Sequence, residues 1–488
     1  MIQNLSSSVG TSPIFPNAKT FREIIWYRGK NNAQSTFAIW RGPSGEMLSM
    51  TFGELYERTG VLSNWISRTF QRGRIAVIGE NSISWILVYY SLLNSSSAAT
   101  LPDPNLAPSD MSNLLQRSKV NCVFLTPSYS HTEQLKSLLP GLPFYTLDPE
   151  TLQEIYKENK HLSVSYPELA PEDPAVIHYT SGTTGIPKCV LISHHGILSS
   201  TRGTDSLHFY ENTPKVLPIL PLFHSFGRIS MDYSLADGRT LCILSDFSHV
   251  TEALDFFQPD IVLSVPAMIA PLLASPKISF TRMIVAGAAT SASQLAALRA
   301  RGVIPVNSYG MTETASTITG QLPGKQKDGS VGVPPGNGAW EIKIDTNGEV
   351  CVRGGSIMTE YIGDEAATRE ILRDGWLHTG DLGYIDEDGF LFLTGRCKNL
   401  IILANGKNVS PEALENKLQS IPGVKEVIVF ASDNKICAEI FAPDCDEKTL
   451  RRGITALNRE LPTYQRIQKL IFRSNPFNRT PSGKIKRT

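Results

Sequence analysis

One stretch of ten residues combines hydroxyls, glycines and a lysine. It reads Tyr-Thr-Ser-Gly-Thr-Thr-Gly-Ile-Pro-Lys and covers residues 179–188. Glycines let backbone N–H groups turn towards an anion, hydroxyls donate further hydrogen bonds, and a lysine adds positive charge. The stretch therefore predicts a polyphosphate-binding loop, with a plain turn as the alternative. The residues expected to contact the phosphates are Thr180, Ser181, Gly182, Thr183, Thr184, Gly185 and Lys188.

The spacing of this loop differs from that of a Walker loop. Pro187 precedes the lysine, and the apolar run 189–192 that follows is typical of a strand. The loop is therefore predicted to join two strands, with no helix N-terminus behind the phosphates. This pattern argues against an ordinary P-loop NTPase.

The loop closely resembles the phosphate loop of the adenylate-forming superfamily, which includes acyl-CoA synthetases, adenylation domains of peptide synthetases and beetle luciferases. The segment 307–314, Asn-Ser-Tyr-Gly-Met-Thr-Glu-Thr, resembles the second motif of that family. In this motif Tyr309, followed by Gly310, offers a flat face to adenine. Thr312 offers a hydroxyl to the α-phosphate, and Glu313 offers a hard oxygen ligand to Mg²⁺.

Two further segments resemble nucleotide-binding motifs of the family. Gly287, Ala288 and Ala289 resemble the segment beside the adenine, although a simple tight turn explains these residues equally well. The segment 378–383 resembles the ribose motif, and an ionised Asp381 only accepts hydrogen bonds, which suits two ribose hydroxyls. A lone aspartate in a turn more often reflects turn chemistry. The spacing from the other motifs favours the ribose interpretation.

The segment 395–399 resembles the hinge between the large and small domains of the family. The resemblance implies that Arg396 holds nucleotide oxygens and that Lys398 lies at the pivot. A solvated surface lysine is the alternative for Lys398.

The final motif, at residues 479–487, resembles the C-terminal lysine loop of the family. The resemblance places Lys484 between the substrate carboxylate and the α-phosphate, whereas a basic tail is otherwise a solvated end. Gly406 would face the thiol tunnel. Many relatives have two adjacent glycines there, and this chain has Asn405 and Gly406.

Taken together, these motifs imply an ATP-dependent acid–thiol ligase, with ATP, Mg²⁺ and CoA as the acceptor. The substrate carboxylate would attack the α-phosphorus and expel pyrophosphate, and a thiol would then displace AMP. Both first reactants are anions, so the protein must cancel charge and align them.

The segment 221–227 resembles the border of the acyl pocket. Amino-acid-activating relatives have Phe-Asp at this place, whereas this chain has Phe223 and His224. Without an acidic partner for a substrate ammonium, we expect a fatty or aryl acid. A packed core histidine is the alternative for His224. No carrier domain follows Lys484, so the predicted acceptor is free CoA, with the pantetheine thiol of a separate acyl carrier protein as the alternative.

Two rivals on the same fold are a luciferase-like oxidase and a non-catalytic nucleotide-binding protein. Ligases are far commoner than such oxidases. The presence of Lys484, Glu313 and Asp381 argues against a protein that only binds nucleotide, because such a protein needs no mobile lysine.

The elements that must position these residues alternate between short apolar strands and helices, which implies mainly parallel sheets flanked by helices. Between residues 320 and 395, Gly and Asp turns separate short alternating runs and predict a small β-barrel-like portion. Ser410 is predicted to cap a helix in a small α+β region. Strands are expected at 75–78, 98–101, 122–125, 261–265, 283–286, 303–306, 349–353, 390–394, 426–431 and 435–441, and helices at 82–93, 109–117, 267–273, 291–301 and 447–460.

The predicted fold class is therefore α/β. We expect a large N-terminal domain of residues 1–395 and a small mobile C-terminal domain of residues 396–488, hinged near Lys398. A chain of 488 residues is too long for one compact core.

Composition excludes several classes of protein. Lys plus Arg and Asp plus Glu both number 46, and this balance argues against a nucleic-acid partner. The apolar run 85–93 is too short to span a bilayer and predicts a buried helix. The polar N-terminus does not resemble a signal peptide. The seven cysteines are scattered without a C-x-x-C pair, so the sequence predicts neither a zinc site nor a disulfide framework and indicates a cytoplasmic location.

Overall fold

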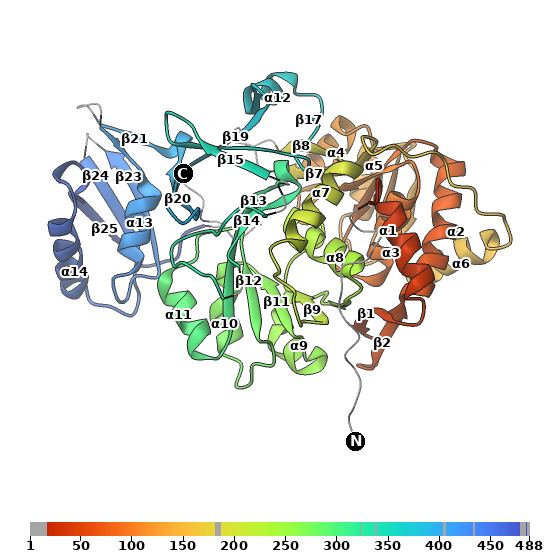
Figure 1. Cartoon of the computed structure of the whole chain (residues 1–488), viewed down its shortest axis with the longest axis horizontal. Coiled ribbons are helices and arrows are strands. Elements are labelled where there is room, and N and C mark those ends of the chain that lie inside the picture. The colour runs from red at the N-terminus through yellow and green to blue at the C-terminus, as the bar shows by residue number, and fades with distance from the viewer. Residues whose placement is uncertain are drawn as a thin grey trace.

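The computed structural model describes residues 17–180, 187–322, 324–336, 338, 340–403, 407–432, 435–478 and 485. Figure 1 shows a large body on the right and a small body, formed by the last strands and helices, on the left. Among the described residues, the large body contains three sheets and the small body a separate three-stranded sheet.

The largest sheet has eight strands in the order β14-β13-β12-β11-β9-β10-β1-β2. Its inner strands are parallel to one another, and the edge strands β2 and β14 are antiparallel to their neighbours. Strand β11 is buried along its whole length, as in parallel sheets covered on both faces. The elements are β1 (Thr36–Arg41), β2 (Met47–Thr51), β9 (Lys215–Pro218), β10 (Thr240–Ile243), β11 (Ile261–Ser264), β12 (Arg282–Val285), β13 (Ile304–Met311) and β14 (Ser316–Gly320), with helices α8 (Ser225–Asp237), α9 (Val250–Phe257), α10 (Ile269–Leu273) and α11 (Ala292–Ala300) and 3-10 turns η1 (Phe247–His249), η2 (Pro266–Met268) and η3 (Thr312–Thr314).

The second sheet has seven strands in the order β17-β8-β7-β4-β3-β5-β6. All its pairs are parallel except those of β8, which runs antiparallel to both β7 and β17. The elements are β3 (Arg74–Ile78), β4 (Ala98–Leu101), β5 (Cys122–Leu125), β6 (Phe144–Thr146), β7 (Pro174–Thr180), β8 (Lys188–Ser193) and β17 (Glu360–Tyr361), with helices α1 (Phe21–Asn31), α2 (Phe52–Phe70), α3 (Ile83–Asn94), α4 (Pro108–Arg117), α5 (Thr132–Leu138), α6 (Pro149–Asn159) and α7 (His194–Asp205).

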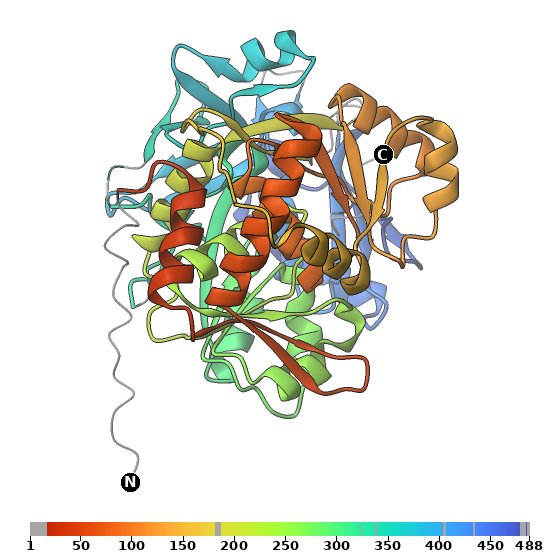
Figure 2. The ribbon, with the colours of Figure 1, turned by 90° about the vertical axis from the view of Figure 1, so that its right-hand side faces the viewer.

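Helices join these two sheets into one body. Helices α1, α2 and α3 pack together, as the red and orange helices of Figure 2 show, and α1 also contacts α8. Helix α7 contacts β8 of one sheet and β14 of the other. One apolar cluster accordingly contains Phe37 and Leu241 from the eight-stranded sheet together with Val176 and Ile192 from the seven-stranded sheet.

The third sheet is antiparallel, with the order β15-β16-β19-β18 and β20 paired to β19. Glu349 of β16 pairs with Leu382 of β19, but Cys351 pairs with His378, so residues 379–381 bulge opposite a single residue of β16. Gly380, with φ +71°, provides the left-handed conformation of this β19 bulge. The elements are β15 (Trp340–Ile344), β16 (Glu349–Gly354), β18 (Leu372–Arg373), β19 (Trp376–Ile385), β20 (Leu391–Arg396) and helix α12 (Glu365–Ile371).

The small body has an apolar core of its own, formed by residues between Ile401 and Phe472. Ser410 caps its first helix by accepting a hydrogen bond from the backbone N–H of Ala413 at 3.2 Å, as predicted. The elements are η4 (Cys397–Asn399), β21 (Ile401–Ile402), β22 (Asn408–Val409), α13 (Pro411–Gln419), β23 (Glu426–Ser432), β24 (Lys435–Phe441), α14 (Glu447–Glu460), η5 (Thr463–Gln465) and β25 (Lys469–Arg473).

The predicted fold class is confirmed: the chain is α/β, with mixed sheets and a separate small domain at its C-terminal end. The barrel-like portion corresponds to the five-stranded antiparallel sheet. Strand β13 runs further than the predicted 303–306, because β14 pairs with its second half. The predicted helix 267–273 is instead a 3-10 turn starting at Pro266, followed by the short helix α10.

The apolar run 85–93 lies in the buried helix α3, as predicted. Across the described part of the chain, every helix falls short of the length and apolar composition that crossing a membrane requires.

Candidate active site

The predicted phosphate loop connects β7 and β8, which confirms that it joins two strands. Thr180 and Lys188 are paired at the end of this hairpin, so both ends of the loop start from one edge of the sheet. The ammonium of Lys188 lies 4.4 Å from the ring centroid of Tyr361 in β17. The intervening loop residues Ser181, Gly182, Thr183, Thr184 and Gly185 lie outside the described residues.

The carboxyl group of Glu313 is buried in the turn that follows β13. Its Oε1 accepts a hydrogen bond from the hydroxyl of Tyr361 at 2.7 Å. Burial raises the pKa of Glu313, while the hydrogen bond from Tyr361 and the charges of Arg396 and Lys188 act in the opposite direction. Two cations therefore act on one buried carboxyl group. Thr312, which precedes it, is partly exposed.

Gly310 lets β13 and β14 come close together at this turn. A Cβ atom at Gly310 would lie 1.7 Å from the carbonyl oxygen of Ser316, so a side chain would require the backbone to move. The chain reverses at Ala315, whose φ of 54° is left-handed. The position of Thr312 and Glu313 therefore depends on having glycine, which has no side chain, at position 310.

Asp381 connects three segments of the candidate nucleotide site. Its Oδ2 accepts a hydrogen bond from the hydroxyl of Tyr309 at 2.7 Å. Its Oδ1 lies 2.8 Å from Nε of Arg396. Only 5% of Asp381 is exposed, so the partners determine where its oxygens point. The residues predicted for the adenine, the ribose and the nucleotide oxygens thus meet in direct contact.

The segment 287–289 follows β12, and its residues are exposed. The last residue of β12, Val285, pairs with Asn307 of β13, two residues before Tyr309. Gly287 has φ +85°, which favours glycine at the turn. The segment with Ala288 and Ala289 therefore leaves the sheet from the strand next to the one that carries Tyr309.

The hinge segment 395–399 lies next to the same carboxylate. Burial lowers the pKa of Lys398, and the charge of Arg396 lowers it further, whereas Asp381 and Glu412 raise it. The charge of Lys188 lowers the pKa of Lys398 as well, by a smaller amount. Gly406 and Lys484 lie outside the described residues.

A buried polar network beneath the site was not predicted from the sequence. Arg228 and Asp232 of α8 form a fully buried ion pair. Arg228 also donates to the carbonyl oxygen of Ala315 at 2.6 Å, which holds the turn after Glu313. The i, i+4 spacing of two opposite charges within an otherwise buried helix was the signal that could have revealed it.

The same network reaches the segment predicted to border the acyl pocket. Nε of Arg228 lies 3.1 Å from Nε2 of His178, and because guanidinium only donates, Nε2 must be the acceptor. Nδ1 of His178 then carries the proton and donates to the carbonyl of Phe223 at 2.9 Å. Burial holds the pKa of His178 well below its usual range, consistent with this neutral form. The next residue, His224, is partly buried, and its ring centroid lies 4.4 Å from that of Phe223.

The described site therefore gathers two carboxyl groups with different surroundings. Asp381, oriented by a hydroxyl and a guanidinium, can accept hydrogen bonds from a diol. Glu313, close to Lys188 and Arg396, lies where phosphate charge and a hard metal ion could be accommodated. This arrangement suits a nucleoside triphosphate.

Comparison with protein families gives two matches. Residues 26–362 match the model described as AMP-binding enzyme, and residues 398–488 match the AMP-binding enzyme C-terminal domain. Together they cover most of the chain, and residues 363–397 lie between them.

Individual proteins are similar over long stretches. The 4-coumarate–CoA ligase 4 of Arabidopsis thaliana is 31% identical over 357 residues, which are 66% of this chain and 62% of that protein. A long-chain-fatty-acid–CoA ligase of Bacillus subtilis strain 168 is 31% identical over 345 residues, 66% of this chain and 61% of that protein. Each match spans less than two thirds of the relative's length.

Among solved structures, an O-succinylbenzoate coenzyme A synthetase from Bacillus subtilis, in complex with ATP and a magnesium ion, superimposes with a TM-score of 0.80. Its sequence is 25% identical, and the similarity covers 95% of this chain and 98% of that one.

The contact between Tyr309 and Asp381 can be tested by Tyr309→Phe. The change removes one donor from a buried carboxylate, and we expect the free energy of unfolding to fall by about 1–3 kcal/mol. Denaturant titration measures this loss. Tyr384→Phe is the matched control, because this tyrosine is half exposed and lies in β19, the strand that also carries Asp381. Equal effects of the two changes would contradict the role given to the Tyr309 hydroxyl.

Proposed function

We propose that this chain, which belongs to the AMP-binding enzyme family, is an AMP-forming ligase that activates a carboxylic acid and transfers the acyl group to a thiol. Membership of the family confirms the predicted resemblance to the adenylate-forming superfamily. The relatives reported above are named as CoA ligases or synthetases, which supports this reaction class.

The observation that carries the proposal is the convergence of Asp381, Tyr309 and Arg396 beside Glu313 and Lys188. Asp381 can accept hydrogen bonds from a diol, and Glu313, acted on by the charges of Arg396 and Lys188, can serve as a metal ligand. A protein that recognised only an adenosine group would have no use for the second carboxyl group.

In the proposed first step, Asp381 accepts hydrogen bonds from the ribose hydroxyls, and Lys188 with the 180–185 loop binds the outer phosphates. The Thr312 hydroxyl donates to an α-phosphate oxygen, and Lys484 brings the substrate carboxylate to the α-phosphorus. A new P–O bond forms to the carboxylate as the bond to pyrophosphate breaks. The product is an acyl-adenylate.

The second step uses the activated carbonyl. A thiol loses its proton and attacks the carbonyl carbon, a C–S bond forms, and AMP leaves. We propose that the boundary between residues 1–395 and 396–488 separates two bodies that reorient between the steps. Lys398 would be the pivot, and the reorientation would exchange Lys484 for the segment containing Gly406.

Magnesium is implied by the family, and the residues present fit it. Glu313 supplies one carboxylate, and Mg²⁺ in nucleotide sites commonly uses one or two carboxylates together with phosphate oxygens and water. The bound ion would neutralise charge on the phosphates. Lys188 and Arg396 add to that neutralisation from the protein side.

For the acid, we propose a fatty or aryl carboxylate. The segment containing Phe223 and His224 offers an aromatic ring and an imidazole, and no carboxylate is present at the position where amino-acid-activating relatives have aspartate. Relatives named for 4-coumarate and for long-chain fatty acids support this class. We propose CoA as the thiol, with the pantetheine of a carrier protein as the second candidate.

Pyrophosphate exchange into ATP tests the proposed function directly. We expect exchange that depends on an added acid, with aryl or fatty acids active and α-amino acids inactive. Acyl-adenylate formation followed by thioester formation with CoA, but not with a holo carrier protein, would identify the acceptor. Nucleotide binding without exchange for any acid would favour the non-catalytic alternative, and acid-independent ATP hydrolysis would favour an NTPase.

Lys484→Ala separates the two steps. We expect adenylate formation to fall by at least about a hundredfold, because one charge-assisted contact to both reacting anions is lost. Conversion of a supplied acyl-adenylate to the thioester should change little. Lys486→Ala is the matched control for loss of charge in the same segment. A similar loss in both steps for Lys484→Ala would contradict the role of Lys484 in adenylate formation.

Glu313→Gln addresses the metal. We expect the Mg²⁺ concentration for half-maximal exchange to rise about tenfold or more, since an amide replaces a charged oxygen ligand. Glu365→Gln, an exposed glutamate in α12, serves as control. An unaltered Mg²⁺ titration in Glu313→Gln would exclude this residue as a ligand.

A further inference from the structure

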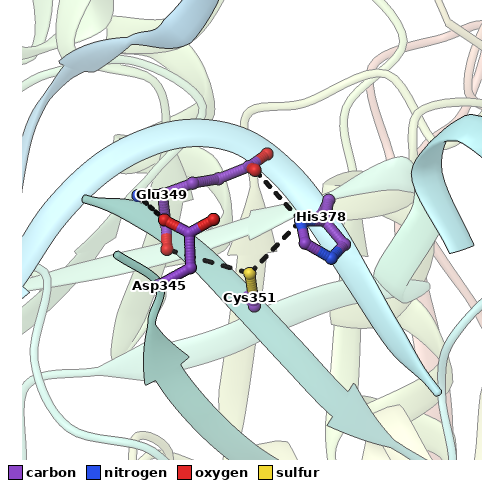
Figure 3. A group of neighbouring side chains, drawn as sticks. All are labelled: Asp345, Glu349, Cys351 and His378. Atoms are coloured by element: carbon purple, nitrogen blue, oxygen red, sulfur yellow. Dashed lines mark hydrogen bonds and ion pairs between the residues drawn. The ribbon is translucent and has the colours of Figure 1, made fainter. Parts of the chain in front are cut away.

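Four side chains with metal-binding atoms converge on the antiparallel sheet, outside the candidate active site. One nitrogen, one sulfur and two carboxylate oxygens all lie within 4.8 Å of one another (Figure 3). We call this group the β16–β19 cluster; it consists of Asp345, Glu349, Cys351 and His378.

The strand register creates this cluster. Cys351 and His378 are directly opposed on β16 and β19, and the thiol sulfur lies 3.4 Å from Nδ1 of His378. Glu349 lies two residues before Cys351, on the same face of β16. The β19 bulge then lets its carboxylate reach Nδ1 of His378 at 3.0 Å. Figure 3 shows these side chains pointing towards one another.

Each carboxylate is held by the backbone through one oxygen, and the other oxygen of Glu349 contacts His378. Oδ1 of Asp345 accepts from the backbone N–H groups of Asn347 and Glu349 at 2.9 and 2.8 Å. Oε1 of Glu349 accepts from the N–H of Gly380 at 2.8 Å. Backbone anchoring of this kind orients metal ligands before an ion arrives. The cysteine is buried, and the other three residues are partly exposed, so an ion can enter from solvent.

The distances and the donor types indicate one class of ion. Zn²⁺ bonds of about 2.0–2.3 Å in a tetrahedron place neighbouring donor atoms roughly 3.3–3.8 Å apart. The observed separations of 3.0 and 3.4 Å around Nδ1 of His378 approach this range. Sulfur and imidazole nitrogen favour zinc-like ions over Mg²⁺ or Ca²⁺, which prefer oxygen.

We propose that the β16–β19 cluster binds a single Zn²⁺ ion. On binding, the thiol of Cys351 releases its proton to solvent, and the imidazole proton of His378 moves from Nδ1 to Nε2. A thiolate and two carboxylates around a doubly charged ion leave one negative charge, which the guanidinium of Arg373, 3.7 Å from Oε2 of Glu349, compensates.

This zinc site is separate from the nucleotide site but adjoins it. The amide that anchors Glu349 belongs to Gly380, inside the β19 bulge that also contains Asp381. The sequence lacks the C-x-x-C spacing that marks many zinc sites, so its scattered cysteines did not predict a zinc site. The structure instead combines a cysteine and a glutamate of β16, a histidine of β19 and an aspartate of the turn between β15 and β16.

Co²⁺ provides a spectroscopic test. The full-length chain is stripped with EDTA, dialysed, and titrated with Co²⁺ in the absence of nucleotide. We expect one Co²⁺ per chain, a near-ultraviolet thiolate-to-cobalt charge-transfer band, and visible bands of a four-coordinate site. Zn²⁺ should displace the cobalt, and a large excess of Mg²⁺ should not.

Variants assign the ligands. Cys351→Ser should abolish the charge-transfer band. His378→Gln should weaken Co²⁺ binding by more than about a hundredfold, because removing residues that only hydrogen-bond to metal ligands already costs up to about that much. Cys445→Ser, which changes a thiol of the small domain, should bind normally. Glu313→Gln should also bind normally, which distinguishes this site from the magnesium ligand of the nucleotide site.

If replacing the buried Cys351 prevents folding, Asp345→Asn provides a second ligand variant. Its amide oxygen can keep the backbone hydrogen bonds that Oδ1 of Asp345 accepts. Circular dichroism checks that each variant is folded. Absence of stoichiometric Co²⁺ binding would overturn the proposal. A charge-transfer band that survives in folded Cys351→Ser, or unchanged affinity in both folded His378→Gln and Asp345→Asn, would overturn it equally.

Discussion

A buried carboxylate with partners on two other strands is the constraint on which the candidate site depends. Asp381 lies in β19, accepts a hydrogen bond from the hydroxyl of Tyr309 in β13 and pairs with Arg396 at the end of β20. A buried charge is tolerated only where it is paired or hydrogen-bonded. The eight-stranded sheet and two strands of the five-stranded antiparallel sheet are therefore held together at this carboxylate.

A second polar network fixes the opposite side of the site. Arg228 holds the carbonyl of Ala315 and, through neutral His178, the carbonyl of Phe223. The turn that carries Glu313 and the segment that carries His224 are thus attached to one fully buried guanidinium. This network specifies relative position. Its groups are buried, and the bonds of Arg228 to Ala315 and His178 and of His178 to Phe223 join elements that are far apart in the chain.

The sequence was informative wherever the signal was local. The apolar runs 98–101 and 122–125 became strands with those bounds, and Pro187 with the run 189–192 correctly indicated a strand after the loop. Contacts between distant segments were not predictable. Neither the hydrogen bond of Tyr361 to Glu313 nor the pairing of Cys351 with His378 has any local pattern, because both depend on strand register. The β19 bulge, which shifts that register, appears only in the folded chain.

The separate core of the small domain has an energetic consequence. Its apolar cluster contains residues of 401–472, whereas Leu391 and Leu393 of β20 belong to a different cluster of the large body. Contacts across this boundary include the hydroxyl of Ser410 donating to the carbonyl of Thr394. The rotation about residues 395–399 proposed above would therefore break this polar contact without opening either apolar core. Orientations related in this way would differ little in heat capacity, and their balance would respond to ionic strength more than to temperature.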